Sequence, residues 1–186
     1  MRRSLIALSA LSLLAACGPK PEGKEKSPDA NPSATVITPA NETAAPTFVS
    51  QAAQGDMFEI EAAKIAAARS ANPDVKAFAA MMTEAHTKSS AALKTAAALG
   101  GVTLPAAVSP EQQAKLDKLN KEEAKAFDEE YVEGQIDAHQ TMLNLMSRYA
   151  NDGAFGPLKT LAVDTMGGVQ AHLDSAKSLK SKLETK

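Results

Sequence analysis

The 186-residue chain has no tryptophan, a single cysteine and only 4% aromatic residues. Neither sign of charge dominates, because 20 lysine and arginine residues face 22 aspartate and glutamate residues. Nucleic-acid-binding domains carry basic patches interleaved with aromatic side chains, so this composition argues against a nucleic-acid partner. The length suits one domain of ordinary size better than two. Glycine-rich phosphate loops, serine triads and paired glycosidase carboxylates are not recognisable in the sequence.

The first 16 residues have the layout of a bacterial export signal, with Arg2 and Arg3 followed by an apolar run and small residues. The apolar run is too short to span a bilayer stably. Its end, Leu14-Ala15-Ala16-Cys17, resembles a lipoprotein box, in which the signal is cleaved and the cysteine is lipid-modified. The alternatives are a short transmembrane anchor and a simple secretory signal.

A lipid-modified Cys17 would make the membrane a partner of the protein through acyl chains, since two or more chains anchor a protein stably. Gly18 follows the cysteine, and in lipoproteins of this kind a residue other than aspartate implies the outer membrane. The expected location is therefore the periplasmic side of the cell envelope. Without the signal, 18 basic residues face 22 acidic ones, and no thiol remains for a disulfide, a metal or catalysis.

Residues 17–46 are predicted to form a tether, because six prolines lie among small and polar residues. From residue 47 onward the pattern changes to apolar residues at helical spacing, which predicts a folded domain over 47–186. Asn72-Pro73, Gly100-Gly101 and a Ser109 to Gln112 capping box mark the boundaries of helices. The expected helices cover about 48–71, 73–99, 110–119, 122–150 and 157–183.

The long helices predict an all-α fold, a ferritin-like four-helix bundle of two helical hairpins. The long connection between the hairpins carries the short extra helix. Gly167 and Gly168 lie inside the pattern of the last helix, where close helix packing is their simplest interpretation.

The three histidines, His86, His139 and His172, fall on three different long helices, each on the inward apolar stripe. Counting along the helices at 1.5 Å per residue places all three, and Glu59 on the first helix, near mid-height. The four side chains are therefore expected to meet inside the bundle. Glu61 and Asp56 lie close to Glu59 in sequence.

Three imidazoles and one carboxylate are a suitable ligand set for one transition metal ion, such as zinc, iron, copper or manganese. A di-iron bundle needs a carboxylate three residues before a histidine, and those positions hold Thr83, Ile136 and Val169. The alternative is a metal-free buried polar layer in which the histidines bond Glu59, Tyr131, Gln135 or trapped water. The methionines of the helices are interpreted as core fillers, and soft copper ligation is their alternative.

A set of residues spread over the folded part carries a family resemblance: Phe48-Val49, Ala52-Ala53-Gln54-Gly55, Glu59-Ile60-Glu61, Ala66, Asn72-Pro73-Asp74-Val75-Lys76, Phe78, Met82, His86-Thr87, Gly101-Val102-Thr103-Leu104-Pro105, Phe127-Asp128, Tyr131, Gln135, His139 and His172-Leu173. Together they resemble the bacterial domain of unknown function 4142 over about 47–183.

The resemblance implies an exported, envelope-associated protein with a ferritin-like bundle crossed by its long connection. It also makes a set of polar residues the positions of interest: Glu59, His86, Asp128, Tyr131, His139 and His172. Members commonly carry an acidic residue directly before the first histidine, where this chain has Ala85.

Two functions follow as hypotheses from different classes. The first is a lipid-anchored periplasmic bundle with a non-catalytic binding or structural role. The second is a mononuclear metalloprotein that stores, senses or uses one transition metal at the mid-bundle histidines. No nucleophile or acid–base pair can be named, so an enzyme is the less favoured class.

Overall fold

A computed structural model of the chain describes residues 43–185, apart from the side chain of Lys125. The predicted signal peptide, the predicted lipidation site Cys17 and the predicted tether up to residue 42 lie outside the described residues. Within the described residues, no helix has both the length and the apolar character needed to cross a membrane.

The described part of the chain is all-helical, as the sequence predicts. It contains five α-helices and no strand: α2 (Ala45–Arg69), α3 (Pro73–Leu99), α4 (Pro110–Lys121), α5 (Ala124–Asp152) and α6 (Gly156–Glu184). The predicted boundaries agree with the observed ones to within three residues. The largest difference is at α2, which begins before the predicted start because Pro46 fits the first turn of a helix.

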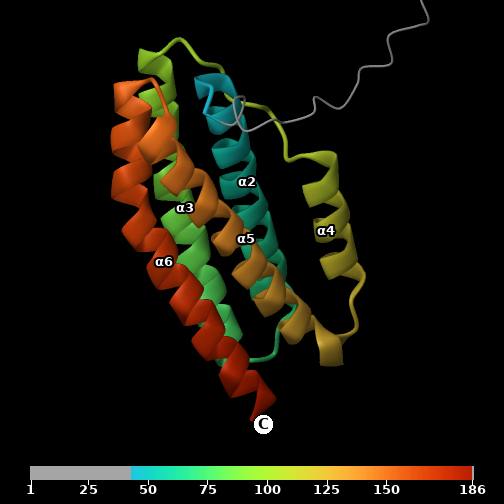
Figure 1. Ribbon diagram of the computed structural model, residues 1–186. Helices are drawn as coiled ribbons and strands as arrows, with labels where there is room; N and C mark the ends of the chain where they lie inside the picture. The colour runs from blue at the N-terminus through green and yellow to red at the C-terminus, as the bar shows by residue number, and fades with distance from the viewer. Residues whose placement is uncertain (1–42, 186) are drawn as a thin grey trace, which may run out of the picture. The chain divides into compact units, whose positions relative to one another are not determined.

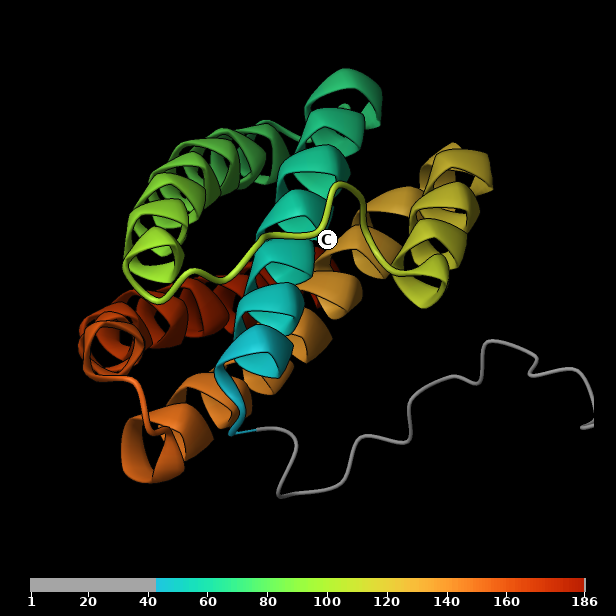
Figure 2. The same ribbon diagram turned by 90° about the horizontal axis from the view of Figure 1, so that it is seen from above.

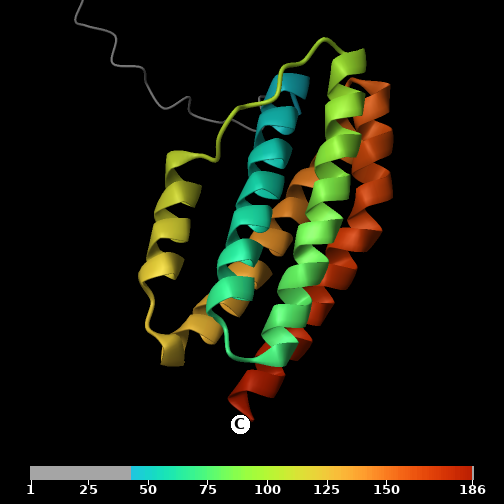
Figure 3. The same cartoon turned by 180° about the vertical axis from the view of Figure 1, so that it is seen from behind.

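The four long helices form a bundle of two antiparallel hairpins (Figures 1 and 3). One hairpin is α2 and α3, the other is α5 and α6, and the hairpins pack through contacts of α3 with α6 and of α2 with α5. α2 and α6 run in one direction, and α3 and α5 run in the other, so each helix is antiparallel to both of its neighbours (Figure 1). Residues on α2, α3, α5 and α6 can therefore meet at one level of the bundle.

Two of the predicted helix starts have the expected caps. The Asn72 side chain accepts a hydrogen bond from the backbone N–H of Asp74, ahead of Pro73. Ser109 and Gln112 form the reciprocal capping box at the start of α4. These caps fix where α3 and α4 begin.

The connection after α3 passes the end of the bundle at which α2 begins, and α4 then lies beside α2, on the side away from α3 and α6 (Figures 1 and 2). Leu116 and Leu119 form the apolar side of α4, and both are buried. Arg69 at the end of α2 donates to the backbone carbonyls of Leu119 and Glu122, and its guanidinium lies 4.7 Å from the centre of the Phe127 ring. This arginine ties the end of α2 to α4 and to the start of α5.

The apolar core consists of two clusters, one toward each end of the bundle. The first includes Phe58, Met82 and Phe127, and the second includes Phe48, Leu93 and Tyr149. Between them lies a band of buried polar side chains: Asp56, Glu59, His86, Gln135 and His139. Polar groups in the middle of a core are costly unless they are satisfied, which makes this band the place to look for a function.

Candidate metal centre

The three histidines converge in the buried polar band. The ring centres of His86 on α3, His139 on α5 and His172 on α6 lie 5.4 to 5.7 Å from one another. One ring nitrogen from each histidine belongs to a group in which all atoms lie within 4.8 Å of one another. No thiol and no carboxylate oxygen of the described residues belongs to this group.

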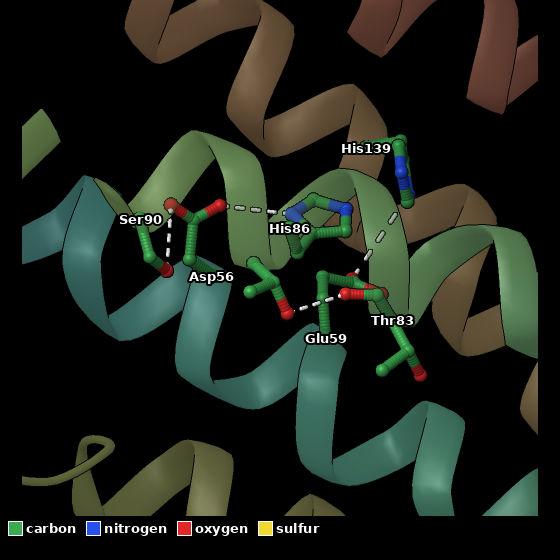
Figure 4. A network of polar contacts seen from close by, with 7 residues as sticks. Asp56, Glu59, Thr83, His86, Ser90 and His139 are labelled. Carbon is green, nitrogen blue, oxygen red and sulfur yellow. Dashed lines mark hydrogen bonds and ion pairs between the residues drawn. The ribbon is translucent and has the colours of Figure 1, made fainter. Parts of the chain in front are cut away.

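His86 is oriented by a carboxylate on the neighbouring helix. Its Nδ1 lies 2.8 Å from Oδ1 of Asp56 on α2, and the two residues are only 5% and 3% exposed (Figure 4). The Ser90 hydroxyl donates to the other oxygen of Asp56 at 3.3 Å. Because a carboxylate only accepts hydrogen bonds, the proton of neutral His86 belongs on Nδ1, and Nε2 of that form presents a lone pair.

His139 is oriented by its own helix. Its Nδ1 lies 2.8 Å from the backbone carbonyl oxygen of Gln135, one turn earlier in α5. A carbonyl also only accepts, so His139 likewise presents a lone pair at Nε2. The Nδ1 of the half-buried His172 has no hydrogen-bond partner among the described residues.

Each of the three histidines has one ring nitrogen that is unsatisfied within the described part of the chain. His86 Nε2, His139 Nε2 and His172 Nδ1 are buried and lack hydrogen-bond partners there. No contact in the described part of the chain fixes which nitrogen of His172 carries the proton. With that proton on Nε2 the group presents three lone pairs, of which one water can satisfy two and one metal cation can bind all three.

Burial keeps two of the three rings neutral. It lowers the pKa of His139 to about 4, against the bond to the Gln135 carbonyl, and it also lowers the pKa of His172. Burial acts on the pKa of His86 in the same direction, but the hydrogen bond to Asp56 and the negative charges of Glu59 and Asp56 outweigh it, and that pKa is raised. Neutral imidazole is the form that binds metal ions.

The dimensions of the group suit a metal with three imidazole ligands. Three points no more than 4.8 Å apart have a common centre at most about 2.8 Å away from each, compared with about 2.0–2.1 Å for a zinc–nitrogen bond. Each ring therefore needs to shift by less than about 1 Å to reach bonding distance. Three histidines also leave a fourth tetrahedral position open.

Glu59 lies beside the group but outside it. Its Oε1 is 3.9 Å from Nδ1 of His139, the nitrogen that faces the Gln135 carbonyl (Figure 4). Neither carboxyl oxygen has a hydrogen-bond partner among the described residues. Burial raises the pKa of Glu59 to about 7, although His86 and the nearby Gln135 amide act to lower it.

The other expected polar neighbours each have a buried polar atom without a hydrogen-bond partner among the described residues. The Tyr131 hydroxyl, the Gln135 side-chain carbonyl and one oxygen of Asp128 are buried and have no partner in the described part. Burial, then the charge of Glu59, raises the pKa of Tyr131. The acid that contacts a histidine ring at hydrogen-bond distance is thus Asp56, which the expected set of Glu59 and three histidines did not include.

A cavity of about 230 Å³ opens beside the histidines between α3 and α6. Its lining includes His86, His172, Met142, Met146 and Gly168. The expectation of close packing at Gly167 and Gly168 is wrong, because a Cβ atom at either position would meet nothing within 4 Å. Glycine in a helix interior costs about 1 kcal/mol relative to alanine, and no packing contact explains that cost here.

These features define the class of the molecule as an all-helical bundle with a buried cluster of histidines. The family model described as "Domain of unknown function (DUF4142)" matches residues 30–179, so the chain belongs to this family. A solved structure, the crystal structure of a DUF305 fragment from Deinococcus radiodurans, is similar in fold with a TM-score of 0.66 at 14% identity. The similarity covers 74% of this chain and 95% of that one. No curated protein matches the chain.

Proposed function

We propose that the protein binds one transition metal ion through His86, His139 and His172. Two observations carry the proposal: the three histidines, from three helices, each bring one ring nitrogen within 4.8 Å of the others, and each has a buried ring nitrogen without a partner among the described residues. The hydrogen bonds from Asp56 and the Gln135 carbonyl support it, because metal-ligating histidines typically donate their other N–H to such groups.

The chemistry of the ligands favours a borderline metal. Imidazole suits zinc, copper, iron and nickel, whereas magnesium and calcium prefer oxygen ligands. Among divalent ions, the general order of stability predicts the tightest binding for Cu²⁺. A single metal is proposed, because the positions three residues before the histidines hold Thr83, Ile136 and Val169 in place of the carboxylates of a di-iron site.

The bundle is proposed to be a four-helix arrangement of the ferritin-like kind. The support is its two antiparallel hairpins and the single long connection, residues 100–109 and α4, that joins them. Such bundles build metal sites from side chains on facing helices, and the three histidines come from α3, α5 and α6. The proposed ferritin-like arrangement and the proposed metal site are therefore consistent with each other.

Metal analysis tests the proposed site. Protein purified without affinity tags or chelators and then incubated with Zn²⁺ or Cu²⁺ is expected to hold about one ion per chain. A His86→Ala, His139→Ala double variant is expected to lose it, as measured by elemental analysis after desalting. Removing two of three ligands leaves no group that can hold a metal ion against desalting.

Met82→Ala is the matched control for that experiment. Met82 is fully buried on α3, four residues before His86, so its truncation opens a comparable space without removing a ligand. The control is expected to retain metal, with circular dichroism showing that all variants fold. Absence of metal from the wild type would contradict the proposal and leave the non-catalytic binding or structural role that the sequence favours.

The protein is further proposed to be a lipoprotein, anchored at Cys17 on the periplasmic side of the outer membrane. Cys17→Ala is expected to leave the protein soluble or unprocessed, because neither acylation nor the lipoprotein type of signal cleavage can then occur. Fractionation and mass measurement of the N-terminus check this, with Ser27→Ala as a control that leaves the lipoprotein box intact. Recovery of a processed Cys17→Ala protein in the membrane fraction would contradict the anchor.

A further inference from the structure

The cavity between α3 and α6 reaches two of the three proposed ligands. His86 and His172 both line it, whereas His139 lies outside its lining, on α5. His86 is only 5% exposed and its Nε2 has no partner among the described residues. A metal held among the three rings would therefore have its remaining coordination position on the side of this cavity.

Gly168 lies on the exposed edge of the cavity lining. A Cβ atom at this position would meet no atom within 4 Å, so a larger side chain has room beside the lining. Ala85 on α3 is a second small residue in the lining. Gly168 weakens the helix and has no packing contact that would explain it. Its presence is explained if a larger side chain at this position would fill the space beside the histidines.

The size of the cavity limits what can enter. At about 230 Å³ it is smaller than the pockets of roughly 300–1,000 Å³ that hold drug-sized ligands. Met142, Met146 and Val169 supply apolar wall, which disfavours multiply charged molecules. Two carboxylates also line the cavity: Asp56, which is buried against His86, and the exposed Asp164, which water and salt screen. The buried Asp56 compensates one of the two positive charges of a divalent metal bound by three neutral imidazoles, so the remaining charge favours one negative charge at the open position.

We infer that this cavity is an entry and binding site for a small monoanion that coordinates the metal at its open position. The inference rests on the proposed metal site and adds the class of its exogenous ligand. The ligand has only a few non-hydrogen atoms, with hydroxide as its simplest member, and it replaces a water at the metal. Gly168 and Ala85 determine its access from the two sides of the cavity.

Azide titration of the copper-loaded protein tests this inference. The wild type, loaded with one Cu²⁺ per chain, is expected to develop an azide-to-copper charge-transfer absorption that saturates. Gly168→Leu is expected to bind azide at least about tenfold more weakly, because its side chain occupies the cavity. It should keep its copper, since leucine favours a helix and Gly168 is not a ligand.

Gly167→Leu is the matched control. Gly167 is the preceding residue, is also exposed and also has no atom within 4 Å of an added Cβ, but it is not part of the cavity lining. Its azide affinity is expected to equal that of the wild type. Ala85→Leu fills the cavity from the opposite side and is expected to weaken azide binding as Gly168→Leu does.

The outcomes separate this inference from the metal proposal. Copper uptake by the wild type without azide binding would overturn the ligand site and leave the metal site standing. If both Gly168→Leu and Ala85→Leu bind azide as tightly as the wild type, the ligand site is overturned and the metal site stands. Loss of copper from Gly168→Leu would also overturn the ligand site. No copper uptake by the wild type would overturn the metal site and the ligand site together.

Discussion

Replacing Glu59 by glutamine is expected to stabilise the metal-free protein at pH 8 by about 3 kcal/mol more than at pH 4. Burial raises the pKa of Glu59 to about 7 from its usual 4.5, so the folded state holds this proton more tightly than the unfolded state. Below pH 4.5 both states are protonated. Between pH 4.5 and 7 only the unfolded state loses the proton, so the wild type loses stability as the pH rises. Glutamine resembles the protonated acid and does not titrate.

Denaturant unfolding with a chelator present, at several pH values between 4 and 8, measures this effect. Comparing the variant with the wild type at both ends of the range cancels the packing difference between the two side chains. Glu61→Gln is the control, because Glu61 is exposed on the same helix in an ion pair with Lys64. The free energy of unfolding of Glu61→Gln is expected to stay within about 0.5 kcal/mol of the wild-type value at every pH. If the free energies of unfolding of Glu59→Gln and the wild type changed with pH in parallel, this carboxyl would not be buried in its acid form.

The fold follows from local signals that act within a few residues. Asn72 with Pro73, and Ser109 with Gln112, satisfy backbone N–H groups at helix starts, and both pairs are found at the predicted positions. The inward stripe of α3 is equally local, since Val75, Ala79 and Met82 are buried at the expected spacing. Such signals do not specify how the hairpins pack, and that arrangement depends on contacts between residues far apart in the chain.

The level of the site could be predicted, but its contacts could not. Counting residues at a fixed rise gives the height of each histidine along its helix, and the three rings do meet between the two apolar clusters. Asp56 and Glu59 lie three residues apart on the same face of α2, and both are 3% exposed. Which of them contacts a ring depends on helix rotation and side-chain rotamers, which residue counting does not give.

The cavity beside the histidines had no signal in the sequence. Gly167 and Gly168 are adjacent, yet only Gly168 lines the cavity. A glycine inside a helical pattern indicates either close packing or a space that must stay open. These two cases differ only in what lies opposite the glycine, which belongs to another helix.

Replacing Asp56 by asparagine is expected to weaken metal binding about 10- to 100-fold while leaving the stoichiometry at one ion per chain. The Asp56 carboxylate accepts a hydrogen bond from Nδ1 of His86 at 2.8 Å, which fixes the ring and increases the basicity of Nε2. Asparagine has the same shape but no charge, so the ring loses basicity, and its orientation is less strongly held. Competition for Zn²⁺ against a chromophoric chelator at pH 8, where protons compete least with the metal, measures the change in affinity.

Asp164→Asn separates the effect of this contact from a general effect of charge. Asp164 is an exposed residue that also lines the cavity, and it makes no hydrogen bond to a histidine ring. Both variants remove one negative charge near the proposed metal, but only Asp56→Asn changes the partner of a ligand. The affinity of Asp164→Asn is expected to stay within about threefold of the wild type, because exposed charges are screened by water and salt. Equal losses in the two variants would mean that the field of the acids, and not the orientation of His86, holds the metal.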